Sequence, residues 1–157
     1  MSVEIRQAAS EDADAIAALL REAFAEFESL YTPEGFAATA ISSEEVVGRI
    51  AEGPVWVGSD EERVVGTASA VTREDGLYVR GMAVVPSMQG RGVGRRLLDQ
   101  VEAFAREVGA QRMYLSSTPF LSSAIRLYER YGFLRTEEGP DDLHGTPLFT
   151  MEKPLWS

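Results

Sequence analysis

The stretch VVPSMQGRGVGRRLL, residues 84–98, decides how the fold of this chain is interpreted. Two β-branched residues end a strand-like run, glycines follow at positions 90, 92 and 94, and an apolar stripe at helical spacing begins after the second glycine. A loop that leads from a strand directly into a helix exposes backbone N–H groups at the positive end of the helix dipole. Glycines remove the β-carbons that would keep a phosphate from the backbone, and Arg91, Arg95 and Arg96 add positive charge. These residues predict a site for a pyrophosphate group.

Other phosphate-binding loops fit this stretch less well. A nucleotide P-loop has lysine followed by serine or threonine after its last glycine, whereas two arginines follow Gly94 here. The dinucleotide pattern requires a glycine three residues after Gly92 or Gly94, and those places hold Arg95 and Leu97. The glycine spacing alone also allows a plain turn with a basic helix start and no ligand.

The hydrophobic pattern on both sides of this loop predicts one α/β domain over residues 1–157. Before the loop it indicates a strand, two helices and an antiparallel meander of three strands; after it, a helix, a strand, a helix and a last strand. The expected strands are Val3–Gln7, Val55–Gly58, Val64–Thr72, Leu77–Val85, Arg112–Ser117 and Leu148–Lys153. The expected helices are 10–27 with Ser10 as N-cap, 42–53 with a capping box, 93–108, and Leu121–Tyr131, while Tyr31–Ile41 is expected to be an irregular connection.

Composition limits the classes of function. The chain has 15 Lys and Arg against 25 Asp and Glu, a formal net charge of −10, which disfavours nucleic acid as a partner. There is no cysteine and a single histidine, His144, so disulfides, thiolate nucleophiles and histidine-rich metal centres are excluded and no metal is expected. No apolar run approaches the roughly 20 residues of a membrane span, and the N-terminus lacks signal-peptide features, so we expect a cytoplasmic protein without membrane contact.

Two motifs in this order resemble the GNAT superfamily of acyl-CoA-dependent N-acetyltransferases. The family's acyl-CoA motif is Gln or Arg, two residues, Gly, one residue, then Gly or Ala, and Gln89, Gly92 and Gly94 match it. Residues 124–133, AIRLYERYGF, resemble the family's A-x-x-L-Y-x-x-x-G-F helix end, and residues 149–155 resemble its last strand. The resemblance therefore covers nearly the whole chain.

The resemblance implies an α/β (α+β) fold with a mixed, mostly antiparallel sheet of six to seven strands flanked by about four helices. It implies that the sheet splays between its fourth strand, Leu77–Val85, and its fifth, Arg112–Ser117, and that acetyl-CoA lies in the gap as acyl donor. By the same resemblance, the donor is bound by backbone groups of the fourth strand and of the loop, at Met82, Ala83, Val84, Gln89, Gly90, Arg91, Gly92, Val93, Gly94 and Arg95.

The implied activity is N-acetyl transfer from acetyl-CoA to a primary amine by direct attack in a ternary complex. A thiol-borne acyl-enzyme is excluded because the chain has no cysteine. The acceptor is expected to be a small-molecule or peptide amine, and the acidic net charge favours a cationic one such as a polyamine, an aminoglycoside or a lysine side chain. A non-catalytic acyl-CoA-binding or regulatory module on the same fold is the alternative, and a homodimer is left open.

Tyr128 matches the family's general acid, which protonates the departing thiolate; its other interpretation is a core tyrosine on the apolar face of its helix. The glutamate that serves as base in many relatives corresponds to Ser116, and a serine cannot act as a base at neutral pH unaided. The base therefore stays unassigned. Its candidates are Glu26, Glu28, Tyr31, Tyr114, His144 and ordered water.

Arg80 lies on the strand that is expected to line the cleft, two residues before Met82. It can bind a substrate carboxylate, or it can lie on the solvent face of the strand paired with an acid. The residues that the sequence offers for the acceptor are Glu28, Tyr31, Arg80 and Ser116.

Overall fold

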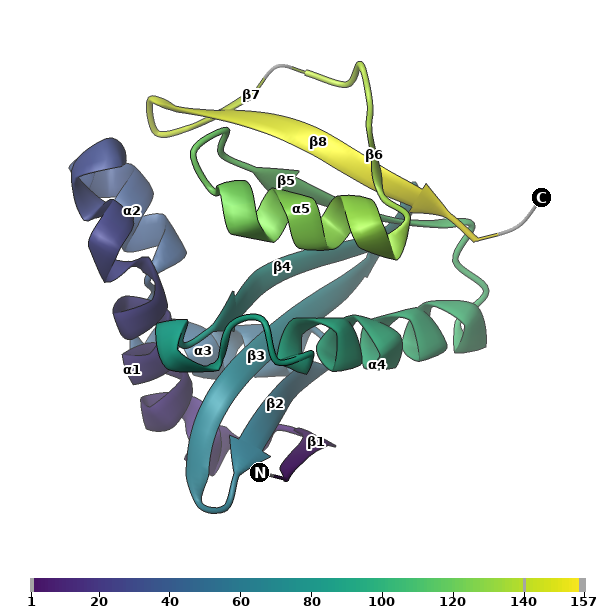
Figure 1. Ribbon diagram of the computed structural model, residues 1–157. Coiled ribbons are helices and arrows are strands. Elements are labelled where there is room, and N and C mark those ends of the chain that lie inside the picture. The colour runs from purple at the N-terminus through teal and green to yellow at the C-terminus, as the bar shows by residue number, and fades with distance from the viewer. Residues whose placement is uncertain (1, 140, 156–157) are drawn as a thin grey trace.

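An open, twisted sheet runs through the molecule, of which the structure, a computed structural model, describes residues 2–139 and 141–155 (Figure 1). Within these residues the strand order is β1-β2-β3-β4-β5-β8-β6, with β7 paired to β8. Neighbouring strands are antiparallel except β4 and β5, which are parallel. The strands are β1 (Val3–Gln7), β2 (Val55–Asp60), β3 (Arg63–Arg73), β4 (Gly76–Val84), β5 (Arg112–Ser117), β6 (Leu134–Arg135), β7 (Asp141–Leu143) and β8 (Thr146–Pro154).

Helices cover both faces of the sheet (Figure 1). One face carries α1 (Ala13–Phe24) and α3 (Ser43–Glu52), which pack on β3 and on each other. The opposite face carries α4 (Val93–Glu107), which packs on the strands from β1 to β5, and α5 (Ser122–Tyr131), which packs beside α4. The remaining helical segments are α2 (Pro33–Thr39) and the short 3-10 turns η1 (Ser10–Asp12), η2 (Ala25–Leu30) and η3 (Pro86–Met88).

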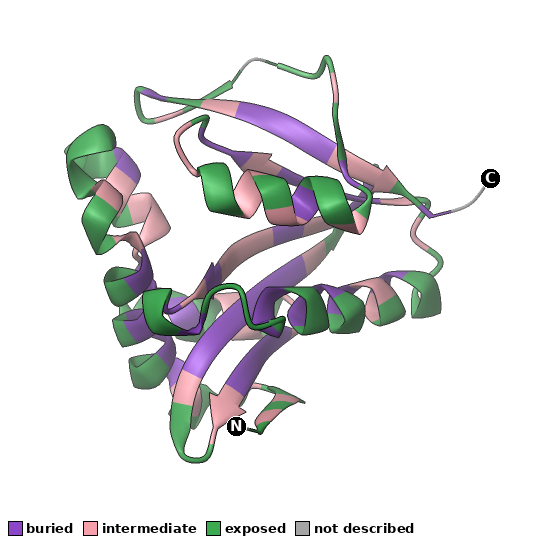
Figure 2. Ribbon diagram, viewed as in Figure 1, coloured by how far each residue is buried: buried purple, intermediate pink, exposed green. Residues whose placement is uncertain are grey.

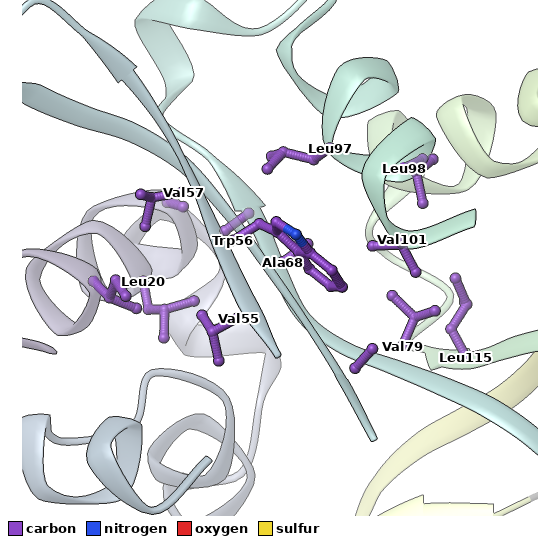
Figure 3. Packing of buried hydrophobic residues seen from close by; sticks show 14 of the residues in the cluster. Leu20, Val55, Trp56, Val57, Ala68, Val79, Leu97, Leu98, Val101 and Leu115 are labelled. Atoms are coloured by element: carbon purple, nitrogen blue, oxygen red, sulfur yellow. The ribbon is translucent and has the colours of Figure 1, made fainter. Parts of the chain in front are cut away.

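Because helices lie on both faces, the central strands are buried on both sides (Figure 2). Successive residues of a strand point to opposite faces. Accordingly Val55 and Val57 point to the side of Leu20 on α1, whereas Trp56 points to the side of α4 (Figure 3). The Trp56 ring meets Phe104 of α4 edge to face, with ring centroids 5.9 Å apart.

The predicted fold class is confirmed. All six predicted strands and all four predicted helices are present in the described residues, with end points that differ by a few residues. Within residues 2–139 and 141–155 there are eight strands instead of six to seven and five α-helices instead of about four, because β6, β7 and α2 were not expected. The two extra strands are two and three residues long, too short to show an alternating pattern.

The prediction that Tyr31–Ile41 is irregular is wrong. Thr32 caps α2 by accepting a hydrogen bond from the Gly35 N–H at 3.0 Å, and Pro33 occupies the first helical position, where its missing N–H costs nothing. Gly35 is the residue that obscured this helix in the sequence. It is buried, and a β-carbon there would come within 2.6 Å of the Thr146 hydroxyl oxygen.

The prediction that Ser10 caps the first helix is also wrong. Ser10 lies inside the 3-10 turn η1, and α1 begins three residues later. The carboxylate of Asp12 fixes the start of this helical segment instead. It accepts hydrogen bonds from the Ala9 N–H at 2.8 Å and from the Arg6 guanidinium at 2.8 and 2.9 Å.

The sheet opens between β4 and β5. Their parallel pairing extends over two residue pairs, Leu77 with Met113 and Tyr78 with Tyr114. Beyond Tyr78 the two strands part, while β4 stays paired to β3 on its other edge as far as Val84. The predicted splay is therefore confirmed.

A bulge in β4 lies within the open part of the strand. Ser69 of β3 is opposite Arg80, but Thr67 is opposite Ala83, so β4 contains one extra residue there. Gly81 takes up the extra length with a φ of +62°, a backbone conformation that favours glycine.

None of the helices within the described ranges combines the length and apolarity needed to cross a bilayer.

Asp12 makes a testable contribution to stability. Hydrogen bonds from Arg6 lower its pKa to about 2, so its stabilising effect is complete above its ordinary pKa and is lost as the pH falls through about 2. We expect Asp12→Asn to lower the free energy of unfolding at pH 7 by about 1 kcal/mol and to flatten its pH dependence below pH 4. Urea unfolding between pH 2 and pH 7 measures both effects. Asp14→Asn, at an exposed position two residues on, is the matched control, and equal behaviour of the two variants would contradict the assignment.

Candidate active site

Two adjoining pockets open where β4 and β5 part. The larger, about 630 Å³, lies between the start of α4, α5 and the end of β4, and is called the α4–α5 pocket. The smaller, about 330 Å³, lies between β4, β5 and the segments around α2 and α3, and is called the β4–β5 pocket. Both are lined by the same four junction residues, Phe24, Met82, Leu121 and Tyr128. Two ligands bound in the two pockets would therefore meet at this junction.

The glycine-rich loop forms one wall of the α4–α5 pocket. Most of the predicted donor-binding residues line it: Met82, Ala83, Val84, Gln89, Gly90, Gly92, Val93, Gly94 and Arg95. The side-chain amide of Gln89 donates to the Val84 carbonyl at 3.1 Å and so ties the loop to the end of β4. Gly90 and Gly92 have φ values of +79° and +84°, and a β-carbon at either position would meet no atom within 4 Å. The loop is therefore open to a ligand at both glycines.

The start of α4 provides unpaired backbone donors. The first bond of the helix runs from the Arg96 N–H to the Gly92 carbonyl at 3.1 Å. The N–H groups of Val93, Gly94 and Arg95 precede that bond and have no acceptor within the helix. Together with the positive end of the dipole of a 15-residue helix, they form an anion site.

Gly94 has a different role from the other two loop glycines. A β-carbon there would come within 2.7 Å of Cδ2 of Leu127, so glycine is what allows α4 to approach α5 closely. This contact sets the width of the α4–α5 pocket, since both helices line it.

The arginines around the loop are arranged differently from the expectation. Arg95 lines the α4–α5 pocket, whereas Arg91 is exposed and is not among the lining residues. The expectation that Arg96 contributes to the anion site is wrong, because its guanidinium donates to the Val3 carbonyl of β1. Instead Arg126 and Arg130 of α5 line the pocket. These two arginines were not among the predicted donor-binding residues, although their spacing of four residues places both on one side of α5.

Tyr128 lies at the junction of the two pockets and is 7% exposed. Burial raises the pKa of its hydroxyl, and the nearby Tyr31 adds to the shift. The hydroxyl is therefore protonated at neutral pH, which suits a proton donor and not a base. Its ring packs against Phe133 with centroids 5.8 Å apart, so the core fixes its position.

Three of the four residues proposed for the acceptor line the β4–β5 pocket: Tyr31, Arg80 and Ser116. Burial raises the pKa of Tyr31, and the hydroxyls of Thr118 and Thr39 oppose the shift. The fourth residue, Glu28, does not fit the prediction, because it is exposed on η2 and lines neither pocket.

The other base candidates are also distributed differently from the expectation. The Tyr114 hydroxyl donates to Asp75 at 2.6 Å and lies outside both pockets, as does the exposed His144. Glu26 lines the α4–α5 pocket and is the single carboxylate among the described residues that line either pocket. The described residues also contain no group of three or more His, Cys, Asp or Glu that is able to hold a metal ion.

Comparison with known proteins agrees with this geometry. The model of the acetyltransferase (GNAT) family matches residues 14–133. The chain is 30% identical over 136 residues to the uncharacterized N-acetyltransferase YjgM of Escherichia coli (strain K12), covering 82% of this chain and 80% of that protein.

Solved structures show the same fold at lower sequence identity. The PaiA N-acetyltransferase from Thermoplasma acidophilum, in complex with coenzyme A, has a TM-score of 0.85 and 19% identity, covering 99% of this chain and 100% of that one. YncA, a putative acetyltransferase from Salmonella typhimurium with its cofactor acetyl-CoA, has a TM-score of 0.74 and 22% identity, covering 100% and 96%.

The open loop makes a specific prediction for donor binding. Gly92→Glu places a negative side chain where a phosphate must approach, so we expect CoA affinity to fall by about 100-fold or more, the equivalent of one to two charge-assisted hydrogen bonds. Gly109→Glu is the matched control: Gly109 also has a positive φ and an open β-carbon direction, but it follows the other end of α4. Both variants carry a similar backbone strain of about 1–3 kcal/mol. Isothermal titration with CoA compares them, and an equal loss in both would place the anion elsewhere.

Proposed function

Because this chain belongs to the acetyltransferase (GNAT) family, we propose that its two pockets bind the two substrates of one acyl transfer. The chain is an acetyl-CoA-dependent N-acyltransferase. In our proposal acetyl-CoA occupies the α4–α5 pocket and a small-molecule or peptide amine occupies the β4–β5 pocket. The observation that carries this assignment is the shared junction at Met82 and Tyr128, where a thioester from one pocket would face an amine from the other.

The α4–α5 pocket suits CoA chemically. Arg95, Arg126 and Arg130 and the open N–H groups at the start of α4 match its phosphates. Beyond Tyr78, β4 has no β5 partner, so the backbone of Met82 and Ala83 has a free edge for an extended ligand that binds like an added strand. Acetyl-CoA itself supplies the activated acyl group and a thiolate leaving group.

The reaction in our proposal is a direct transfer. A new bond forms between the amine nitrogen and the acyl carbon as the carbon–sulfur bond breaks; the nitrogen loses one proton and the sulfur gains one. Tyr128 is the proton donor to the sulfur, because it lies at the junction and its raised pKa keeps it protonated. The chain offers no cysteine for an acyl-enzyme route.

The proton on nitrogen leaves by another path. Ser116, which by the sequence resemblance corresponds to the glutamate base of many relatives, lines the β4–β5 pocket, and none of the described lining residues of this pocket is a carboxylate. We therefore propose that water accepts this proton, with Ser116 at most orienting the water.

The cytoplasmic location, the absence of nucleic acid as a partner and the homodimer stay predictions from the sequence.

Two measurements on the purified chain test the proposed function. CoA and acetyl-CoA bind the native state, so we expect millimolar concentrations to raise the melting temperature by several degrees, whereas NAD should not. Acetyl-CoA with a panel of primary amines should release free thiol in an amine-dependent manner. Absence of both effects would refute the assignment, and stabilisation by CoA without turnover of any amine would favour the non-catalytic module.

The role of Tyr128 has its own prediction. Tyr128→Phe keeps the ring and its packing on Phe133 but removes the proton donor, so kcat should fall by about 100-fold or more while CoA affinity changes little. Ser116→Ala, in the β4–β5 pocket, should lower the rate by less than about tenfold, because a neutral hydroxyl at most positions a water. Single-turnover rates and CoA titration separate the two effects. An unchanged rate in Tyr128→Phe would make Tyr128 a packing residue, and a larger loss in Ser116→Ala would reverse the assignment.

A further inference from the structure

The charge of the β4–β5 pocket is opposite to the charge of the chain. Asp and Glu outnumber Lys and Arg by 25 to 15 overall, yet this pocket is lined by Arg49, Arg73 and Arg80, and no carboxylate is among its described lining residues. The three arginines come from α3, the end of β3 and the middle of β4. The fold therefore brings the guanidinium group of Arg49 together with those of Arg73 and Arg80, from the β3–β4 hairpin, around a pocket of about 330 Å³.

Arg49 is the least compensated of the three. Burial lowers the pKa of its guanidinium, and the positive charge of Arg80 lowers it further. Its Nη1 occupies the space over Gly81, where a β-carbon would come within 2.6 Å. Within the described ranges, the Arg49 guanidinium makes no hydrogen bond or ion pair; Glu45 and Glu52 act on its charge from outside the pocket.

Arg80 is only partly compensated as well. Its Nη2 pairs with Oε1 of Glu52 at 2.6 Å, and the Glu52 side chain is 56% exposed and outside the pocket. The Nε of Arg80 is buried and has no hydrogen-bond partner among the described residues. Burying a donor of a charged group without a partner costs free energy, so the hydrogen-bonding capacity of the Arg80 guanidinium is not fully used by the described residues.

Arg73 is the third arginine in the wall of the β4–β5 pocket. Its guanidinium carbon lies 4.1 Å from the centroid of the Tyr78 ring, a cation–π contact that holds the charge at the pocket wall. The rest of the lining combines hydroxyl-bearing side chains with apolar ones, the latter including Phe24, Val79, Leu115, Leu121, Leu143 and Leu148. A ligand that fits this pocket has an anionic end, and these apolar side chains offer contact to an apolar body.

We propose that the acceptor is a primary amine that also carries a carboxylate, that is, an amino acid with an apolar side chain. Arg49 and Arg80 bind the carboxylate, and the amine reaches the junction at Met82 and Tyr128. This inference rests on the proposed function, since it assigns the acceptor of the same transfer. Planar guanidinium groups match the two oxygens of a carboxylate. The polyamine, aminoglycoside or lysine side chain favoured by the net charge would bring positive charge to three arginines.

Matched acceptors test this inference in the thiol-release assay. L-phenylalanine is compared with phenethylamine and phenylalaninamide, and L-leucine with 3-methylbutylamine; spermidine represents cationic amines. Rates are corrected for the neutral fraction of each amine at the assay pH. We expect kcat/KM to be about 10- to 100-fold higher for the carboxylate of each pair, the range for one charge-assisted hydrogen bond. β-Alanine, taurine and 2-aminoethylphosphonate distinguish a carboxylate site from a site for any anion.

Variants of the two arginines link the preference to the pocket. Arg49→Gln and Arg80→Gln should each raise KM for the carboxylate acceptor about 10- to 100-fold, with kcat and the KM for acetyl-CoA little changed. CoA should raise the melting temperature of both variants as much as that of the wild type, which shows that they are folded and bind the donor. Arg63→Gln is the control, because Arg63 pairs with Glu22 on the surface at 3.1 Å and lines neither pocket.

The outcomes separate this inference from the proposed function. Equal or better turnover of the decarboxylated amines, or of spermidine, overturns the inference and leaves the acyltransferase intact. If no amine is turned over but CoA raises the melting temperature, L-phenylalanine or L-leucine must raise it further in the wild type and not in Arg49→Gln; otherwise the inference is refuted. No response to CoA and no turnover refute the proposed function itself.

Discussion

Pairing between β4 and β5 ends after Tyr78 and Tyr114, and both pockets exist because the strands part there. Within the two pairs, the parallel strands share main-chain hydrogen bonds like any sheet. Beyond them, β4 keeps β3 on one edge and loses its neighbour on the other, which leaves a backbone edge facing a gap. The N–H and C=O groups at an unpaired strand edge lack hydrogen-bond partners, so an extended ligand can bind along this edge of β4 in the gap. The helices α4 and α5 stand on either side of this gap and close contact at Gly94 fixes their separation.

The bulge at Gly81 lies where the open edge of β4 borders the β4–β5 pocket. One extra residue in β4 shifts the strand between Arg80, which lines the β4–β5 pocket, and Met82, which lies at the junction. The same glycine leaves room for the Nη1 of Arg49. A single residue without a β-carbon therefore permits both the strained backbone and the close approach of a buried positive charge.

The sequence predicted those parts of the site that are local in the chain. The strand–loop–helix pattern at residues 84–98 identified the open loop, and the motif around Tyr128 identified the residue at the junction. The sequence did not indicate that the β4–β5 pocket is cationic, because Arg49 of α3 meets Arg73 and Arg80 of the β3–β4 hairpin only through tertiary packing. Net charge favours a cationic acceptor, whereas our proposal favours an anionic one, because net charge sums over the whole surface and not over the residues that line the pocket. Likewise, Arg96 stands beside Arg95 in the sequence, but helical geometry turns it toward β1.

The cationic lining also bears on the missing base. An amine must lose its proton before it attacks, and at neutral pH most free amines are ammonium ions. A positive charge nearby disfavours the ammonium form and lowers the pKa of the amine. Three guanidiniums around the β4–β5 pocket act in this direction; a bound carboxylate and Glu52 offset part of their charge, and no carboxylate among the described lining residues favours the ammonium ion. By the sequence resemblance, Ser116 corresponds to the glutamate that acts as base in many relatives, and in our proposal the serine and the three arginines of the same pocket act together. A carboxylate at position 116 would pair with the arginines and compete with the acceptor for them. In our proposal the neutral Ser116 does not pair with the arginines, which therefore bind the acceptor, and water accepts the proton of the amine.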